Sequence, residues 1–474
     1  MFKKIQKYLL INYPLLWNTK IVPAITFTIL FHILFFIIGY FNGIIDFTNE
    51  NYYDYGFTSG VIIFFSILVT ILFFVLWFVY YFRNNAYKSF YNLKKTSLYK
   101  EWLIILLISF LNVTYSVSYI TGKTLRQRSY YSQEETQKRC ETISMASVFI
   151  AGAYEPNYEQ IEANNTGQIT YNKKTYPQNS LINKSVESFN FNPAVKSESK
   201  VKTWMQENNQ AQIKKLMVDY LAIAKEHNLK SNINAEQWFN LTYNFPDFIK
   251  YEIIGRTSSK DDPNSYSGNA MVYAANQTVY KYNVPQNALV SAYWKISKSW
   301  EDPIIETGLI YTLLYLAITM AMLIFSFKVS SGRNWLIALI STGVLFIITG
   351  ILSALSGSGI TFLVFWLLAI ATFMIHFFIT LGKNKGKNIS GISLNLMLWS
   401  LAGFLPIIYG LVMEFYNNPK TINFGNQIKY ENTPQHDWLE ENLMLFTWVN
   451  ILIVIILMFF ITQFIKKWKG LAES

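Results

Sequence analysis

The feature that most constrains this chain of 474 residues is a set of eight apolar stretches, each long enough to cross a lipid bilayer. A membrane-spanning helix needs roughly 20 predominantly apolar residues. The predicted spans are 22–41, 57–82, 101–120, 305–327, 334–355, 359–382, 391–413 and 443–465. The third is the most polar, with Asn112, Thr114, Ser116 and Ser118. We therefore predict an all-α polytopic membrane bundle with about eight transmembrane helices.

Composition supports this class of protein. Apolar residues make up 52% of the chain and charged residues only 15%, whereas soluble domains carry about 25% charged residues. The single cysteine, Cys140, excludes an intramolecular disulfide and a cysteine-based zinc site. The four histidines, at 32, 227, 376 and 436, lie far apart and show no metal-ligand spacing. We expect no metal and no cofactor.

The distribution of lysine and arginine predicts an orientation. The termini and the loops on their side of the membrane contain 17 basic residues and two acidic ones, Glu101 and Glu473. The first loop on the other side, 42–56, contains no basic residue. Basic residues favour the cytoplasmic side, so both termini are expected in the cytoplasm. Abundant lysine, asparagine and isoleucine are typical of an AT-rich bacterial genome, which favours a multi-pass protein of the bacterial inner membrane.

The spans and loops together predict a domain organisation. The net charge of +11 belongs mainly to the cytoplasmic segments, because residues 121–304 hold 21 basic and 18 acidic residues. The excess charge therefore marks orientation beside an anionic leaflet and not a nucleic-acid surface. The predicted segments are a cytoplasmic amphipathic helix over 1–20, three spans over 21–120, an extracytoplasmic domain over 121–304, five spans over 305–465 and a cytoplasmic tail over 466–474.

The extracytoplasmic domain is predicted to be mostly α, or α with a small β element. A helix should continue from the membrane over 124–151, and apolar periodicity predicts another over 199–228. Shorter helices are expected over 234–244 and 246–254. Alternation of apolar and polar residues within 270–284 indicates a strand or two.

Few ionisable residues fall inside the predicted spans. Glu101, Glu306 and Glu414 lie at span ends, where we expect them to reach water. A transporter coupled to protons or sodium would normally place a carboxylate near the bilayer midplane. His32 and His376 are each expected to hydrogen-bond a neighbouring helix, with a haem site or proton relay as the alternative.

The search for catalytic chemistry identifies one acidic loop and one thiol. The sequence lacks a Walker A loop, a Gly-x-Ser-x-Gly elbow and a His-Glu-x-x-His motif. Asp46, Glu50 and Asp54 in the first outer loop could serve a glycosyltransferase that uses a lipid-phosphate sugar donor, although a solvated loop explains them more simply. Lys138 and Arg139 could lower the pKa of Cys140, but a packed thiol is the simpler interpretation.

Two segments on the predicted cytoplasmic face have the composition of interfacial helices. Before the first span, apolar residues form one side of a helix and lysines another, which predicts contact with the lipid surface. The apolar residues are Phe2, Ile5, Tyr8 and Leu9. Between spans two and three, aromatic and apolar residues recur at helical spacing in 84–99, as expected of a surface that binds a partner protein. Its candidate residues are Tyr87, Phe90, Tyr91 and Leu98.

This layout resembles the permease subunits of type-2 ABC exporters. In that family an amphipathic elbow helix precedes the first span, a coupling helix follows the second, and the ATPase is often a separate chain. The resemblance implies that residues 2–20 are the elbow, that 84–99 contact a cytoplasmic ATPase, and that the extracytoplasmic domain gates or hands on the substrate. Such permeases usually have fewer spans and no domain after the third.

The leading hypothesis is therefore a permease-like subunit of an ATP-driven transport or export complex. The first alternative is a non-catalytic envelope sensor or assembly scaffold that binds an envelope protein through 121–304. The second is a membrane enzyme that acts on a lipid-linked substrate. The lack of a catalytic motif favours a non-enzyme, and the sequence specifies neither the substrate nor the oligomeric state.

Overall fold

The structure, a computed structural model, describes most of the chain apart from several connecting segments. The described residues are 2–13, 17, 20–50, 57–82, 96–150, 162–163, 168–171, 174–177, 200–201, 203–204, 207–242, 253–254, 282–357, 359–383, 387–417, 420–424 and 427–469.

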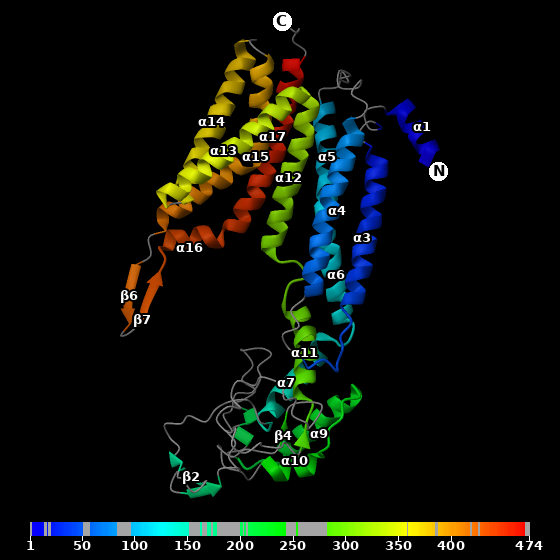
Figure 1. The fold of residues 1–474 in the computed structure, drawn as a ribbon, viewed down its shortest axis with the longest axis vertical. Coiled ribbons are helices and arrows are strands. Elements are labelled where there is room, and N and C mark those ends of the chain that lie inside the picture. Colours follow the sequence, from blue (N-terminus) through cyan, green and yellow to red (C-terminus); the bar gives the residue numbers. More distant parts are fainter. Residues whose placement is uncertain are drawn as a thin grey trace. The chain divides into compact units, whose positions relative to one another are not determined.

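Long apolar helices confirm a multi-pass membrane protein (Figure 1). Within the described residues, seven helices are long and apolar enough to cross a membrane. They are α3 (Ile21–Asn42), α4 (Phe57–Phe82), α12 (Thr307–Val329), α13 (Gly332–Ser356), α14 (Gly359–Lys383), α15 (Lys387–Tyr416) and α17 (Leu443–Lys469). Helices suit this environment because each pairs its own backbone polar groups where water is absent.

The third predicted span is broken. It consists of α5 (Ser97–Val113) and α6 (Tyr115–Arg128), which meet at Thr114 with a bend of 45°. Counting this pair as one span gives eight. The polar residues that distinguish this stretch in the sequence surround the break, where their side chains can pair with backbone groups that the interrupted helix leaves free.

The chain forms two compact units. The helix-bundle unit comprises residues 1–35, 62–119 and 305–474, and the middle unit comprises 36–61 and 120–304. The boundary falls within α3, α4 and α6, so the middle unit contains more than the segment 121–304. It also includes one end of each of the first two membrane helices and the loop between them.

The core of the helix-bundle unit forms around α12. In its membrane-spanning window 39% of the residues are buried, against 11% in α13, so α12 is central and α13 peripheral. Helices α5 and α15 pack along α12. Ala317 and Ala321 of α12 are 1% and 0% exposed, and such small residues let neighbouring helices approach closely.

Shorter elements complete the helix-bundle unit. Helix α1 (Phe2–Asn12) precedes α3 and ends before Pro14. Between α15 and α17, the segment that connects the last two predicted spans contains a β-hairpin and a helix. These are β6 (Lys420–Phe424), β7 (Gln427–Glu431), which pairs with it antiparallel, and α16 (Pro434–Glu441).

The described part of the middle unit is mostly helical with short strands. Its elements are α7 (Gln133–Ser147), α9 (Gln210–Glu226), α10 (Ala235–Thr242), α11 (Gln286–Glu301), β1 (Glu162–Ala163), β2 (Gln168–Tyr171), β3 (Lys174–Pro177), β4 (Ile253–Ile254) and β5 (Tyr282–Asn283). Strands β1, β2 and β3 form an antiparallel sheet, and β4 pairs with β5 in parallel.

Several local predictions for this unit need correction. The helix expected over 124–151 is interrupted after Arg128, because Ser132 accepts a hydrogen bond from the Glu135 backbone N–H and begins a new helix, α7. The helix expected over 199–228 is interrupted, since residues 200–201 and 203–204 are helical but a turn at 207–208 follows and Asn209 caps the start of α9. Ile253–Ile254 form a strand and not the predicted end of a helix, whereas β5 agrees with the strand expected near residue 284.

Candidate functional site

The aromatic segment predicted to bind a partner lies mainly outside the described residues. Tyr87, Phe90 and Tyr91 fall there. Leu98 is described in the first turn of α5 and is only 2% exposed, because it packs in the bundle core. It is therefore a core residue and not part of an exposed partner surface.

The candidate membrane-interface helix forms, but its apolar side chains do not share one environment. Tyr8 is 59% exposed and Leu9 is 9% exposed, while Ile5 is half-buried. The side chain of Phe2 lies outside the described part of the chain. Lys3 is exposed, as the amphipathic pattern requires.

The acidic loop between α3 and α4 is built into the middle unit by its apolar residues. Asp46 is exposed and accepts hydrogen bonds from the backbone N–H and Oγ1 of Thr48 at 2.9 and 2.6 Å, which lower the pKa of Asp46. It thus closes a local turn. Glu50 is half-buried, and Asp54 lies outside the described residues. Ile45 is 6% exposed and belongs to the core of the middle unit.

Phe47 attaches this loop to a polar network on three helices of the middle unit. Its ring stacks on the His227 imidazole with a centroid distance of 3.7 Å and an angle of 8°. It also meets the rings of Tyr130 and Tyr293 edge to face, at 5.7 and 6.2 Å. The backbone N–H of Ile45 donates to the Tyr130 hydroxyl at 3.0 Å.

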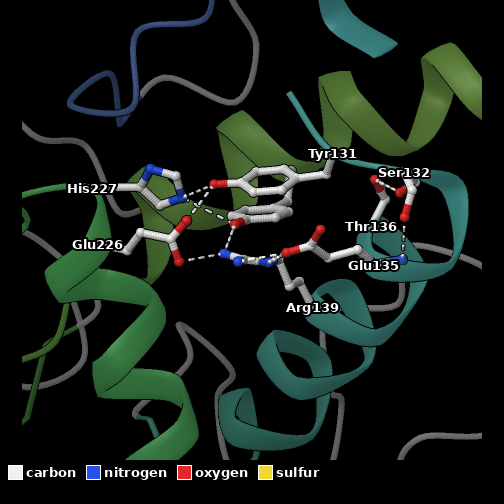
Figure 2. A network of polar contacts seen from close by, with 8 residues as sticks. Tyr131, Ser132, Glu135, Thr136, Arg139, Glu226 and His227 are labelled. Atoms are coloured by element: carbon white, nitrogen blue, oxygen red, sulfur yellow. Dashed lines mark hydrogen bonds and ion pairs between the residues drawn. The ribbon is translucent and has the colours of Figure 1, made fainter. Parts of the chain in front are cut away.

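Arg139 of α7 is the centre of that network (Figure 2). Its guanidinium donates to Glu226 Oε2 at 2.7 Å, to the Tyr293 hydroxyl at 3.0 Å and to Glu135 Oε1 at 2.8 Å. It also lies 4.1 Å from the centroid of the Tyr131 ring. The hydrogen bond from Arg139 is the main cause that lowers the pKa of Glu226, so this carboxylate stays charged.

The hydrogen bonds around His227 are compatible with a neutral imidazole. The Tyr131 hydroxyl donates to Glu226 Oε1 at 2.9 Å. The Tyr293 hydroxyl accepts from Arg139, so its proton is available to His227 Nε2 at 3.0 Å. Burial lowers the pKa of His227, which agrees with a neutral imidazole whose Nε2 accepts. The network therefore joins α7, α9, α11 and the loop between α3 and α4, and it presents no activated nucleophile.

The thiol of Cys140 is also unreactive in this fold. It is 5% exposed, and its Sγ faces the Tyr293 carbonyl oxygen at 3.9 Å. Burial raises the pKa of the thiol to about 12. This agrees with the packed thiol favoured from the sequence and not with a pKa lowered by Lys138 and Arg139.

The two histidines in the membrane helices bond to neighbouring helices, as expected. His32 of α3 lies at the break of the third span, where Nε2 donates to the Leu111 carbonyl at 2.8 Å and Nδ1 pairs with Ser118 Oγ at 2.7 Å. His376 Nδ1 of α14 pairs with Ser393 Oγ of α15 at 2.9 Å. These contacts tie helices together in a setting where unpaired polar groups are costly.

A buried ion pair in the bundle was not predicted. Glu101 of α5 pairs with Lys328 of α12, and their side chains are only 6% and 4% exposed. The expectation that Glu101 reaches water is therefore wrong, whereas Glu306 and Glu414 are exposed. Both partners lie at span ends, but 227 positions separate them, so the sequence gives no signal of their pairing.

The ion pair has polar neighbours along the same end of α12 and the start of α15. Asn395 Nδ2 donates to Ser330 Oγ at 3.0 Å and to the Gly391 carbonyl at 2.7 Å. Trp399 Nε1 donates to Ser326 Oγ at 2.7 Å. These polar side chains form hydrogen bonds with one another and thereby join α12 to α15.

One cluster of metal-ligand type occurs among the described residues. His436, Asp437 and Glu440 of α16 place one ligand atom each within 4.8 Å of the others. The two carboxylate side chains are 54% and 65% exposed, so water satisfies them. Spacing among histidines and cysteines alone could not reveal this group, because two of its members are acids, and its exposure gives no ground for assigning an ion.

Comparisons with known proteins place the chain in no family. No protein-family model, no curated protein and no solved structure matches it.

Proposed function

We propose that this protein is the permease-like subunit of an ATP-driven transport or export complex in the bacterial inner membrane, with residues 121–304 outside and both termini in the cytoplasm. The observation that carries the proposal is the path of α5. This helix begins at Ser97, within the aromatic segment 84–99, and leads through Thr114 into α6, which is partly in the middle unit. A movement imposed at the cytoplasmic loop would therefore act on the extracytoplasmic domain.

The packing of α5 supports this role. Trp102, Ile105 and Ile108 are fully buried. The Tyr99 hydroxyl donates to the Ile455 carbonyl of α17 at 3.3 Å. A helix held this firmly moves with its neighbours, because packed cores shift between discrete arrangements and do not deform continuously.

The ion pair supports the same proposal. It joins α5 to α12, which are the helices that lead into and out of the segment 121–304. Force on one connecting helix is thereby shared with the other. The predicted spans contain no midplane carboxylate and the sequence has no nucleotide-binding motif, so a separate ATPase is the energy source that fits best.

Purification from native membranes tests the proposal. The wild-type protein should retain an ATP-binding chain, and a Tyr87→Asp/Phe90→Asp variant should lose most of it. Arg333→Asp is the matched control, since it adds an acid to an exposed position at the start of α13, also on the predicted cytoplasmic side.

Two results would contradict the proposal: no ATP-binding chain in the purified material, or equal retention in the loop variant. A stable complex with an envelope protein through 121–304, without stimulation of an ATPase, would favour the sensor or scaffold instead. The position of Asp46 in a local turn offers no support for the enzyme hypothesis.

A further inference from the structure

Helix α16 has two chemically different faces. One face lines an apolar cavity and presents residues spaced at i, i+1, i+4 and i+5, which share a side of a helix. These residues are Pro434, Gln435, Trp438 and Leu439. The other face carries the exposed carboxylates of Asp437, Glu440 and Glu441. A helix divided in this way is suited to a boundary between water and an apolar phase.

Two hydrogen bonds fix the position of α16 against α15, and a third caps the start of α16. Thr433 Oγ1 donates to the Tyr416 carbonyl at 2.7 Å, and it accepts from the His436 backbone N–H at the start of α16. The Tyr409 hydroxyl donates to the Leu439 carbonyl at 2.5 Å. The cavity between the two helices is therefore preformed.

The cavity is an open groove with a volume of about 310 Å³, and its other wall is formed by Val412 and Tyr416 of α15. Trp438 at its rim is 61% exposed and Val412 is 39% exposed. This volume is at the lower end of the range for ligand pockets, which suits a narrow, flexible apolar group.

The surface around the cavity is continuous with the surface that faces lipid. Val412 and Tyr416 belong to the last turns of the membrane helix α15. Phe415 beside them is 80% exposed, and Leu445 near the start of α17 is 63% exposed. Contact with an apolar phase stabilises such side chains, and next to a membrane-spanning helix the bilayer is the apolar phase that fits. Tryptophan is enriched at this depth.

We propose that α16 is an interfacial helix and that the cavity between α16 and α15 holds an acyl chain of a lipid from the adjoining leaflet. The acidic face then stays in water while the Trp438 face rests on the bilayer. An acyl chain fits better than a protein segment because the cavity opens onto the lipid-facing surface. An acyl chain in the cavity makes dispersion contacts with the lining side chains, and these contacts are missing when the cavity is empty.

Spin labels on the two faces test the orientation of α16. Trp438→Cys and Glu440→Cys are each labelled with a nitroxide in vesicles of phosphatidylethanolamine and phosphatidylglycerol. The unsubstituted protein serves as the background, because its only cysteine is buried. The ratio of collisions with oxygen to collisions with a water-soluble nickel chelate should be on the order of tenfold higher at position 438. Equal ratios would overturn the proposal, as would shielding of position 438 from both reagents, which indicates a protein partner.

A phosphatidylcholine with a photoreactive acyl chain tests the cavity itself. Adducts should form on peptides from 409–416 and 434–441, and Val412→Trp, which fills the cavity, should reduce them roughly fivefold, as expected when a chain is excluded from a packed site. Adducts at Ile347 of α13, which is 64% exposed, should not change. Val412→Phe provides a second filled variant if the first does not fold. Unchanged adducts in a folded, filled variant, or no adducts on these peptides in the wild type, would overturn the proposal.

Discussion

Replacement of Lys328 by methionine should destabilise the helix-bundle unit, because the Glu101 carboxylate then stays buried without its positively charged partner. The Lys328 and Glu101 side chains are 4% and 6% exposed, so water cannot take the place of the lost ammonium. Removal of one partner from a buried pair costs about 3–5 kcal/mol. This free energy corresponds to a change of roughly 10²–10⁴ in the ratio of folded to unfolded protein.

The double variant Glu101→Leu/Lys328→Met should recover most of that stability, because it removes both charges and preserves apolar volume. Unfolding can be followed by tryptophan fluorescence as SDS is titrated into dodecylmaltoside micelles. Arg333→Met, at an exposed position, controls for the loss of a positive charge and should shift the free energy of unfolding by less than about 0.5 kcal/mol.

The double-mutant cycle also shows which results would contradict the buried ion pair. If the losses of the two single variants simply add in the double variant, the side chains do not interact. If Lys328→Met is no more harmful than Arg333→Met, Glu101 reaches water and the buried pair does not exist.

Three further outcomes are expected in the middle unit. Gly122→Ala should destabilise the protein by about 1–3 kcal/mol or more, because the new Cβ would lie 2.2 Å from the Phe36 carbonyl oxygen. Gly308→Ala is the control, since a Cβ there has no atom within 4 Å. Thermal unfolding of the two variants should show a loss of stability only for Gly122→Ala. Burial lowers the pKa of His227 below its ordinary value of about 6.5, so the unfolded state binds a proton more readily than the folded state. The midpoint of thermal unfolding should therefore fall as the pH drops below about 6.5, and it should fall less in the His227→Gln variant. Cys140 should react with a maleimide at neutral pH only after unfolding, because its thiol is buried and its pKa is raised to about 12; fast labelling of the folded protein would contradict its placement.

The long membrane helices could be predicted because hydropathy over some 20 residues is a local property. The broken third span could be recognised in part, since polar residues such as Asn112 and Thr114 made it the weakest of the eight. The bend of 45° at Thr114 depends on groups from other helices, and hydropathy carries no information about them.

Contacts between residues far apart in the chain could not be predicted from the sequence. Glu101 and Lys328 look like separate residues at the ends of two spans, and Phe47 looks like one aromatic residue in a polar loop. Their partners are chosen by tertiary packing. The β6–β7 hairpin is different, because alternating side chains on either side of Gly425–Asn426 are a recognisable hairpin signal.

The break in the third span also bears on the order in which the protein assembles. Carbonyl groups in the last turn of α5 are paired with side chains from earlier spans: Leu111 with His32 of α3, and Asn112 with Thr70 of α4, at 2.8 and 2.9 Å. Since synthesis runs from the N-terminus, both donors are in the membrane before α5 arrives. The bend is thus supported by helices that insert first, and a chain without α3 and α4 would bring α5 and α6 into the bilayer without these two hydrogen bonds between helices.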